Sequence, residues 1–149
     1  MRPAIALAVA MIVVLVVCAI VQLQLAPPSA ANPLSDPVVG GIGWLEVGIV
    51  IVGSFALGVL VVRSGRRSGL GPALAGVTFA VAAIAAPYAE TLVRPDTKQV
   101  FYIPAGASLP GEFWVGVSVV VGTPVAVFFG ALGAFAALAW KRSRSRSAG

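Results

Sequence analysis

Four long apolar segments dominate the pattern of hydrophobic and polar positions along the chain. They cover about residues 3–25, 42–62, 70–89 and 113–140. Each is close to or above the roughly 20 residues that a helix needs to cross a hydrocarbon core of about 30 Å. Because lipid offers the backbone no hydrogen-bond partners, helices and closed barrels are the only stable ways to cross it. The pattern therefore predicts an all-α integral membrane protein, with four transmembrane helices in an up-down bundle.

The connections between these segments are short, so we expect a single membrane domain over residues 1–149. Residues 26–41 and 90–112 form two loops at one end of the bundle, and residues 63–69 form a basic turn at the other. Proline, alanine and glycine predominate in the first loop, which predicts an extended, irregular segment. The second loop is irregular too, but its run 99–103 is typical of a short strand.

The first segment has a second interpretation, as a cleaved signal peptide. Arg2 precedes its apolar run and small residues follow it. The run is longer than the roughly 7–15 apolar residues of a typical signal peptide, which favours a retained helix.

Charged residues separate between the two ends of the predicted bundle. The acidic residues gather at the end with the loops: Asp36, Glu46, Glu90, Asp96 and Glu112. Eight of the ten basic residues gather at the other end: Arg2, Arg63, Arg66, Arg67, Lys141, Arg142, Arg144 and Arg146. Lysine and arginine accumulate on the cytoplasmic side of membrane proteins. We therefore expect both termini, the turn 63–69 and the basic tail 141–149 to be cytoplasmic in a multi-pass protein of the cell membrane. The excess of arginine over lysine, with abundant alanine, glycine and valine, favours a prokaryotic source.

The composition excludes several classes of function. Hydrophobic residues make up 59% of the chain and charged residues only 10%, against about 25% charged in an average soluble domain. The chain has no histidine and a single cysteine, Cys18. It therefore lacks the ligands of common zinc and haem sites and the base of Ser-His-Asp or Cys-His catalysis. We expect no cofactor, no metal and no enzymatic activity.

The net charge of +5 raises the question of a nucleic-acid partner. The basic residues flank apolar segments, however, which is typical of membrane orientation and of contact with anionic lipid headgroups. We expect the lipid bilayer and anionic headgroups at the basic turn and tail as partners, and no nucleic acid.

Small residues recur at every fourth position in the fourth segment. They are Ser118, Gly122, Ala126, Gly130 and Ala134. Such a stripe lets another helix approach closely, which is how helices associate in lipid. The partner helix is either one of this bundle or part of another membrane subunit, and the sequence leaves both interpretations open.

Pro124 interrupts the fourth segment. A proline inside a helix removes one backbone hydrogen bond and clashes with the preceding turn, which predicts a kink. A broken helix that coordinates an ion is the alternative, but this segment has no acidic or amide side chain at that depth.

Glu46 is the one carboxylate within an apparent span, and ionisable residues in spans are functional candidates. It lies near the loop end of its segment, beside Trp44, so its carboxylate can reach the membrane interface. We expect it to pair there with Arg94 or Lys98, the two basic residues of the loop end. The alternatives are a polar contact with another subunit and a proton or cation site.

These features predict a non-catalytic polytopic membrane protein, an accessory, assembly or scaffold subunit of a larger membrane complex. It would bind other membrane subunits through its small-residue helix faces and its outer loop. The alternative is a small oligomeric transporter or channel for an ion or small solute, which would use Glu46.

Overall fold

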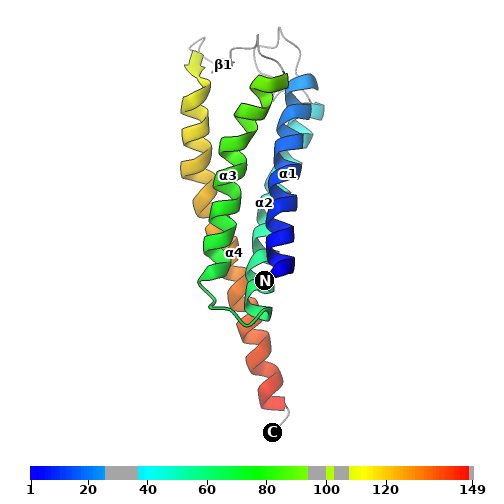
Figure 1. The fold of residues 1–149 in the computed structure, drawn as a ribbon, viewed down its shortest axis with the longest axis vertical. Coiled ribbons are helices and arrows are strands. Elements are labelled where there is room, and N and C mark those ends of the chain that lie inside the picture. Colours follow the sequence, from blue (N-terminus) through cyan, green and yellow to red (C-terminus); the bar gives the residue numbers. More distant parts are fainter. Residues whose placement is uncertain (26–36, 94–99, 103–107, 148–149) are drawn as a thin grey trace.

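The fold consists of four long helices and a small β-ribbon (Figure 1). This computed structural model describes the chain except for residues 26–36, 94–99, 103–107 and 148–149. The helices are α1 (Arg2–Leu25), α2 (Pro37–Arg63), α3 (Leu70–Val93) and α4 (Gly111–Ser147). Each contains a segment long and apolar enough to cross a membrane. The prediction of a helical protein with four apolar, membrane-length helices is confirmed.

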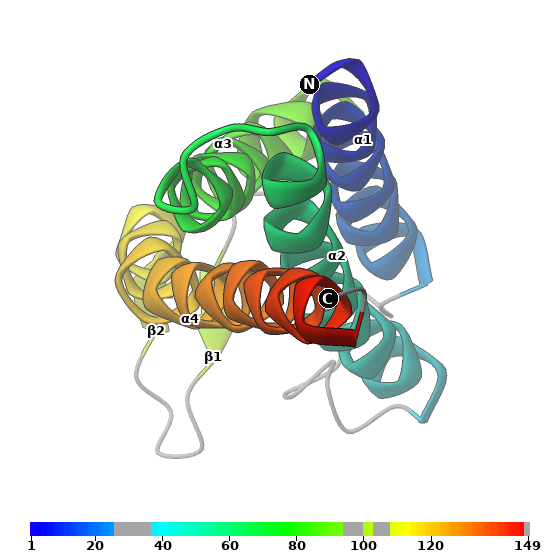
Figure 2. The ribbon, with the colours of Figure 1, turned by 90° about the horizontal axis from the view of Figure 1, so that it is seen from below.

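The helices form a four-cornered bundle when seen along its long axis (Figure 2). Helix α1 packs against α2 and α3, and α4 packs against the same two helices from the opposite corner. Both termini lie at the end of the bundle that carries the turn between α2 and α3 (Figure 1). We call this end the basic end, because the basic side chains described there are Arg2, Arg63, Arg66, Arg67, Lys141, Arg142 and Arg144.

Alanine is the commonest residue in the described interior, and many larger apolar side chains lie on the outside. Seven of the buried core residues are alanines: Ala4, Ala8, Ala75, Ala82, Ala126, Ala134 and Ala137. Exposed positions include many valines and phenylalanines, among them Val120 and Phe135. This distribution suits a lipid environment, where helices associate through close packing and not through exclusion of apolar surface from water.

Helix α2 begins earlier than the sequence predicts. Residues 37–41 belong to the helix and not to an irregular loop, so this part of the loop prediction is wrong. Proline is compatible with the first turn of a helix, because its missing N–H would have no intrahelical partner there. Val39, two residues after Pro37, is buried, so the glycine-rich start of the helix packs against the bundle.

A glycine cap ends α2 at the basic end. Gly65 has a φ of +72°, a left-handed conformation that glycine adopts without a steric penalty. The Arg66 nitrogen donates to the Val61 oxygen at 3.4 Å, and the Gly65 nitrogen donates to the Val62 oxygen at 3.0 Å. These two bonds form a Schellman motif, which satisfies the last carbonyls of the helix. The chain then turns tightly into α3.

Helix α4 is longer than the span predicted from the sequence. Its 37 residues correspond to about 55 Å of helix at 1.5 Å per residue. Residues 141–147 of the basic tail continue the helix, which projects beyond the bundle (Figure 1). The axis of α4 changes direction within the bundle, and Pro124 lies inside this helix.

A two-stranded ribbon lies at the end opposite the basic end (Figure 1). β1 (Val100–Tyr102) pairs in antiparallel register with β2 (Ser108–Pro110), with Phe101 opposite Leu109. β1 falls within the run 99–103 for which the sequence predicts a strand. β2 leads directly into α4, so the ribbon is anchored to the start of that helix.

Candidate functional site

The predicted small-residue stripe of α4 lies largely against helices of the same chain. A side chain at Gly122 would overlap the ring of Phe79 in α3. A Cβ atom at Gly130 would lie 2.9 Å from the Pro72 Cα atom and 3.0 Å from the Ala75 Cβ atom. Both glycines therefore allow α3 to approach α4 more closely than any larger residue would.

The other members of the stripe divide between the interior and the surface. Ala126 is fully buried and Ala134 nearly so. Ser118, the member nearest the ribbon, is exposed. The structure thus brings four of the five stripe residues into the bundle and leaves Ser118 on its outside.

Three glycines bring α2, α3 and α4 into backbone contact, and we call Gly58, Gly71 and Gly130 the glycine contact. A side chain at Gly58 would overlap the Gly130 carbonyl oxygen, and one at Gly71 would lie 2.9 Å from the Gly58 Cα atom. Nearby, a side chain at Gly133 would overlap the Phe55 carbonyl oxygen.

The sequence analysis did not identify Gly58 or Gly71 as contact residues. The available signal was glycine within an apolar span, where it disfavours a helix unless a close approach requires it.

Hydroxyl groups are the polar side chains buried in the described part of the bundle. Thr78 Oγ1 donates to the Leu74 carbonyl oxygen at 2.7 Å. Ser54 is 0% exposed, and its Oγ atom has no hydrogen-bond partner among the described residues. The buried Thr123 Oγ1 atom, next to Pro124, likewise lacks one within that part of the chain. An interior of this kind offers no charged group for acid–base chemistry.

Glu46 lies half-buried on α2, more than two turns after Pro37. Gln22 Nε2 of α1 donates to Glu46 Oε2 at 3.4 Å, so the carboxylate joins two helices. Gly43, nearly one turn earlier, lies beside the same amide, and a Cβ atom there would be in ordinary van der Waals contact with Gln22 Nε2 at 3.6 Å. Trp44 is 78% exposed, consistent with an interfacial level for this part of α2.

The predicted partners of Glu46 in the second loop, Arg94 and Lys98, lie outside the described residues. The expected pairing of these groups stays a prediction. The contact with Gln22 was missed by sequence reasoning, because nothing in the spacing of the two segments indicates which face of α1 meets α2.

At the basic end, two guanidinium groups contact the indole ring of Trp140. The Arg63 Cζ atom is 5.1 Å from the ring centroid of Trp140, and the Arg144 Cζ atom is 4.0 Å from it. Arg63 ends α2, whereas Trp140 and Arg144 belong to α4. Cation–π contacts of this type are worth about 0.5–1 kcal/mol each at exposed sites. The Arg63 contact joins the projecting part of α4 to the end of α2, whereas the Arg144 contact lies within α4.

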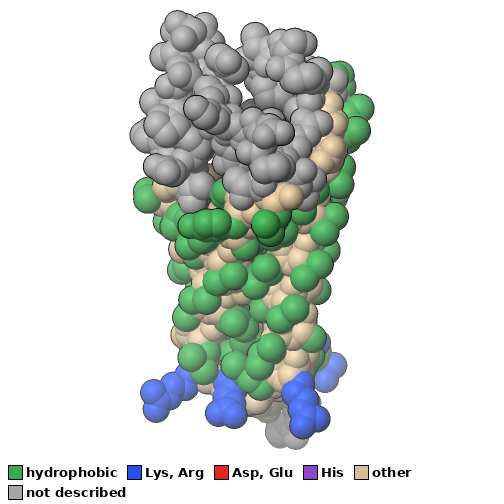
Figure 3. Space-filling view, turned by 45° about the horizontal axis from the view of Figure 1, so that its top comes forward, with side chains coloured by type: hydrophobic (Ala, Val, Ile, Leu, Met, Phe, Trp, Pro, Cys, Tyr) green, Lys and Arg blue, Asp and Glu red, His purple; other side chains and the backbone are tan. Residues whose placement is uncertain are grey.

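The N-terminus joins the same end of the bundle. The Met1 amino group donates to Ser64 Oγ at 3.0 Å, and Ser64 Oγ donates to the Leu60 carbonyl oxygen at 2.8 Å. The positive charge of the amino group therefore adds to that of the arginines and Lys141. Figure 3 shows basic side chains gathered at this end, below a belt of apolar ones.

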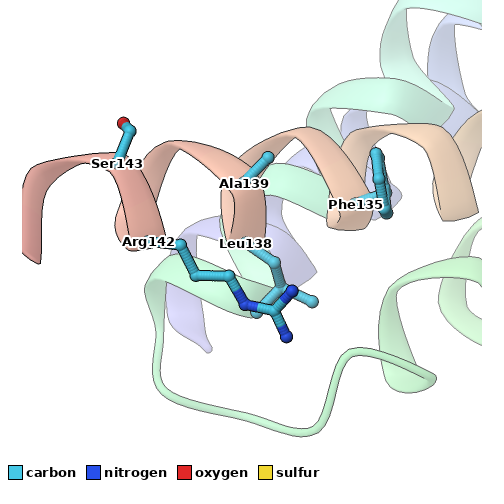
Figure 4. Close-up of a pocket in the computed structure, with 5 residues that line it drawn as sticks. All are labelled: Phe135, Leu138, Ala139, Arg142 and Ser143. Carbon is cyan, nitrogen blue, oxygen red and sulfur yellow. The ribbon is translucent and has the colours of Figure 1, made fainter. Parts of the chain in front are cut away.

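A shallow cavity of about 390 Å³ opens beside α4 where the helix leaves the bundle. Its lining residues are Phe135, Leu138, Ala139, Arg142 and Ser143, which lie along one side of the helix (Figure 4). Apolar side chains thus form the part of the cavity nearer the bundle, and Arg142 and Ser143 form the part nearer the end of the chain.

The described residues contain no group of three or more side chains suited to hold a metal ion. The charged side chains that the structure describes gather in two places, the Glu46–Gln22 contact and the basic end. No protein family matches this sequence, and neither a curated protein nor a solved structure is found to be similar to it.

Proposed function

We propose that this chain is a non-catalytic multi-pass membrane protein that serves as an accessory, assembly or scaffold subunit of a larger membrane complex. The observation that supports this most directly is the glycine contact. It joins three helices through their main chains, with hydroxyl groups as the buried polar side chains of the described interior. Such an interior favours a structural role over catalysis, because general acid–base chemistry needs positioned ionisable groups.

The surface that we propose for a partner subunit is the start of α4 beside the ribbon. Gly116 and Ser118 are exposed there, and a Cβ atom at Gly116 would have no neighbour within 4 Å in this chain. Small residues on the outside of a helix allow a second helix to approach closely. The rest of the predicted stripe is engaged within the bundle, so the proposed contact is confined to this end.

Purification in a mild detergent from the native host tests this proposal. We expect the wild-type chain to co-purify with a defined membrane partner, and Ser118→Leu to weaken that association because the added bulk separates the helices. Ala131→Leu is a matched control, since Ala131 is also exposed on α4 but lies on a different side of the helix. Recovery of the wild-type chain as a monomer without partners would contradict the proposal.

We also propose that the basic end faces the cytoplasm of a prokaryotic cell, because lysine and arginine favour that side. Single-cysteine variants in a Cys18→Ser background test the orientation. A membrane-impermeant maleimide should label Gly41→Cys in intact cells and Ser145→Cys only after the cells are opened. The reverse pattern would require the opposite orientation.

A small oligomeric transporter or channel is the second candidate, and the Glu46–Gln22 contact favours it. A half-buried carboxylate that is hydrogen-bonded between two helices is a common feature of proton and cation pathways. Reconstitution into liposomes tests this function. Glu46→Gln should abolish ion flux, whereas Gln24→Leu, near the exposed end of α1, should not. Equal flux by the wild type and Glu46→Gln would exclude a role for Glu46 in transport.

A further inference from the structure

We propose that the cavity beside α4 binds one anionic phospholipid of the leaflet at the basic end. The phosphate would lie at Arg142, beside Ser143, whose hydroxyl donates to the Trp140 carbonyl oxygen at 2.9 Å. The first part of an acyl chain would lie along Phe135, Leu138 and Ala139. This site is independent of the proposed function as an accessory subunit, because it involves a different end of the molecule.

The lining of the cavity changes from apolar to polar along the axis of α4. Phe135 is 69% exposed at its apolar end, and Arg142 and Ser143 form its polar end (Figure 4). At 1.5 Å per residue, Phe135 and Ser143 are about 12 Å apart along the helix. The order matches a phospholipid whose chain lies toward the hydrocarbon core and whose phosphate lies at the surface.

Trp140 fixes the depth of the site in the membrane. Tryptophan concentrates at the level of the lipid headgroups, and this one contacts Arg63 and Arg144. Arg142 follows it by about half a turn of the helix. The guanidinium group of Arg142 therefore lies at the depth where lipid phosphates are found.

The charge of the basic end favours an anionic lipid. Among the described side chains, seven basic ones lie at this end with the N-terminal amino group, whereas the acidic one, Glu46, lies in the opposite half of α2. Arginine binds phosphate oxygens through charge-assisted hydrogen bonds. A free phosphate could also bind Arg142. It would make no contact with the apolar part of the cavity, however, so the geometry favours a lipid.

Native mass spectrometry of the full chain in detergent tests the site. The probes are phosphatidylglycerol, phosphatidylcholine with the same acyl chains, and glycerol 3-phosphate as the headgroup without chains. We expect one phosphatidylglycerol per chain, bound at least about tenfold more tightly than phosphatidylcholine. Both lipids carry the phosphate, but the positive charges of the basic end repel the choline cation of phosphatidylcholine. Glycerol 3-phosphate should bind more weakly than the intact lipid.

Two variants and one control separate a defined site from general attraction to the basic end. Arg142→Gln removes the phosphate ligand and should weaken phosphatidylglycerol binding about tenfold. Ala139→Leu fills the apolar part and should weaken the intact lipid but not glycerol 3-phosphate. Lys141→Gln removes the same charge about 100° around the helix and outside the cavity lining, so it should leave the affinity nearly unchanged.

Several results would overturn this proposal. Equal binding of the two phospholipids would show that the charge of the headgroup does not matter. Equal losses in Arg142→Gln and Lys141→Gln would indicate diffuse electrostatic attraction and no site. Glycerol 3-phosphate binding as tightly as the intact lipid would assign the site to a free anion. Circular dichroism of each variant checks that the helices are intact, and an unfolded Arg142→Gln leaves Ala139→Leu as the deciding variant.

Discussion

The main chains of Gly58 in α2 and Gly130 in α4 are in direct contact. A Cβ atom at Gly58 would overlap the Gly130 carbonyl oxygen and would lie 2.7 Å from the Ala134 nitrogen. These neighbours are backbone atoms of a helix, which cannot move aside as a side chain can. At this point the distance between the two helices is set by the absence of a side chain.

Gly58→Ala should therefore destabilise the bundle. The added methyl group forces α2 away from α4, and overpacking of this kind costs about 1–3 kcal/mol. The free energy of unfolding, measured by denaturant titration in detergent micelles, checks the prediction. Gly48→Ala is the matched control in the same helix, because a Cβ atom there has no neighbour within 4 Å. If Gly58→Ala and Gly48→Ala had equal free energies of unfolding, the backbone contact between Gly58 and Gly130 would be contradicted.

Gly53→Ala should be tolerated better than Gly58→Ala. The atoms that a Cβ at Gly53 would meet are the Sδ and Cε atoms of Met11, at 2.5 and 2.6 Å. These atoms are at the far end of a flexible side chain, which can adopt another rotamer. We expect a loss below about 1 kcal/mol, in the range of well-tolerated core changes. The same unfolding measurement applies, and a loss as large as that of Gly58→Ala would show that Met11 cannot rearrange.

Trp140→Leu should loosen the projecting end of α4. It removes the ring that contacts both Arg63 and Arg144, at a cost of about 0.5–1 kcal/mol for each exposed cation–π contact. Hydrogen–deuterium exchange of the amides of residues 141–147 should become several-fold faster. Trp44→Leu, at the opposite end of the bundle, controls for the general loss of a tryptophan and should leave this segment unchanged. Unaltered exchange in Trp140→Leu would mean that the helix end is held by other contacts.

Ser54→Ala should leave stability unchanged or raise it slightly. The Ser54 hydroxyl is fully buried and has no hydrogen-bond partner among the described residues, and a buried unpaired polar group costs about 1–3 kcal/mol. Thr78→Val provides the contrast, because Thr78 Oγ1 donates to the Leu74 oxygen. That variant should lose about 0.5–1.5 kcal/mol, the net worth of a typical hydrogen bond. A marked loss of stability in Ser54→Ala would show that the hydroxyl has a partner.

The candidate sites could be predicted only in part from the sequence. Glu46 was identified because a carboxylate in an apolar segment is conspicuous, but its contact with Gln22 depends on how α1 rotates against α2. Gly130 was found through its spacing in a series of five, whereas Gly58 was not, because Ser54 and Gly58 make only a single four-residue step. The cavity at Arg142 was not predicted either, since it requires that the basic tail be helical.

By itself, the sequence determined the four membrane-length helices and predicted the separation of charge between the two ends of the bundle. Length and apolar character are sufficient for this, because lipid forces every crossing backbone to satisfy its own hydrogen bonds. Only the tertiary structure decided which faces meet. Each helix is apolar on all sides, so no polar stripe distinguishes its outer face from its inner one. The inward faces are those where small residues such as Gly58, Gly130 and Ala126 let the backbones approach, and that choice depends on all four helices together.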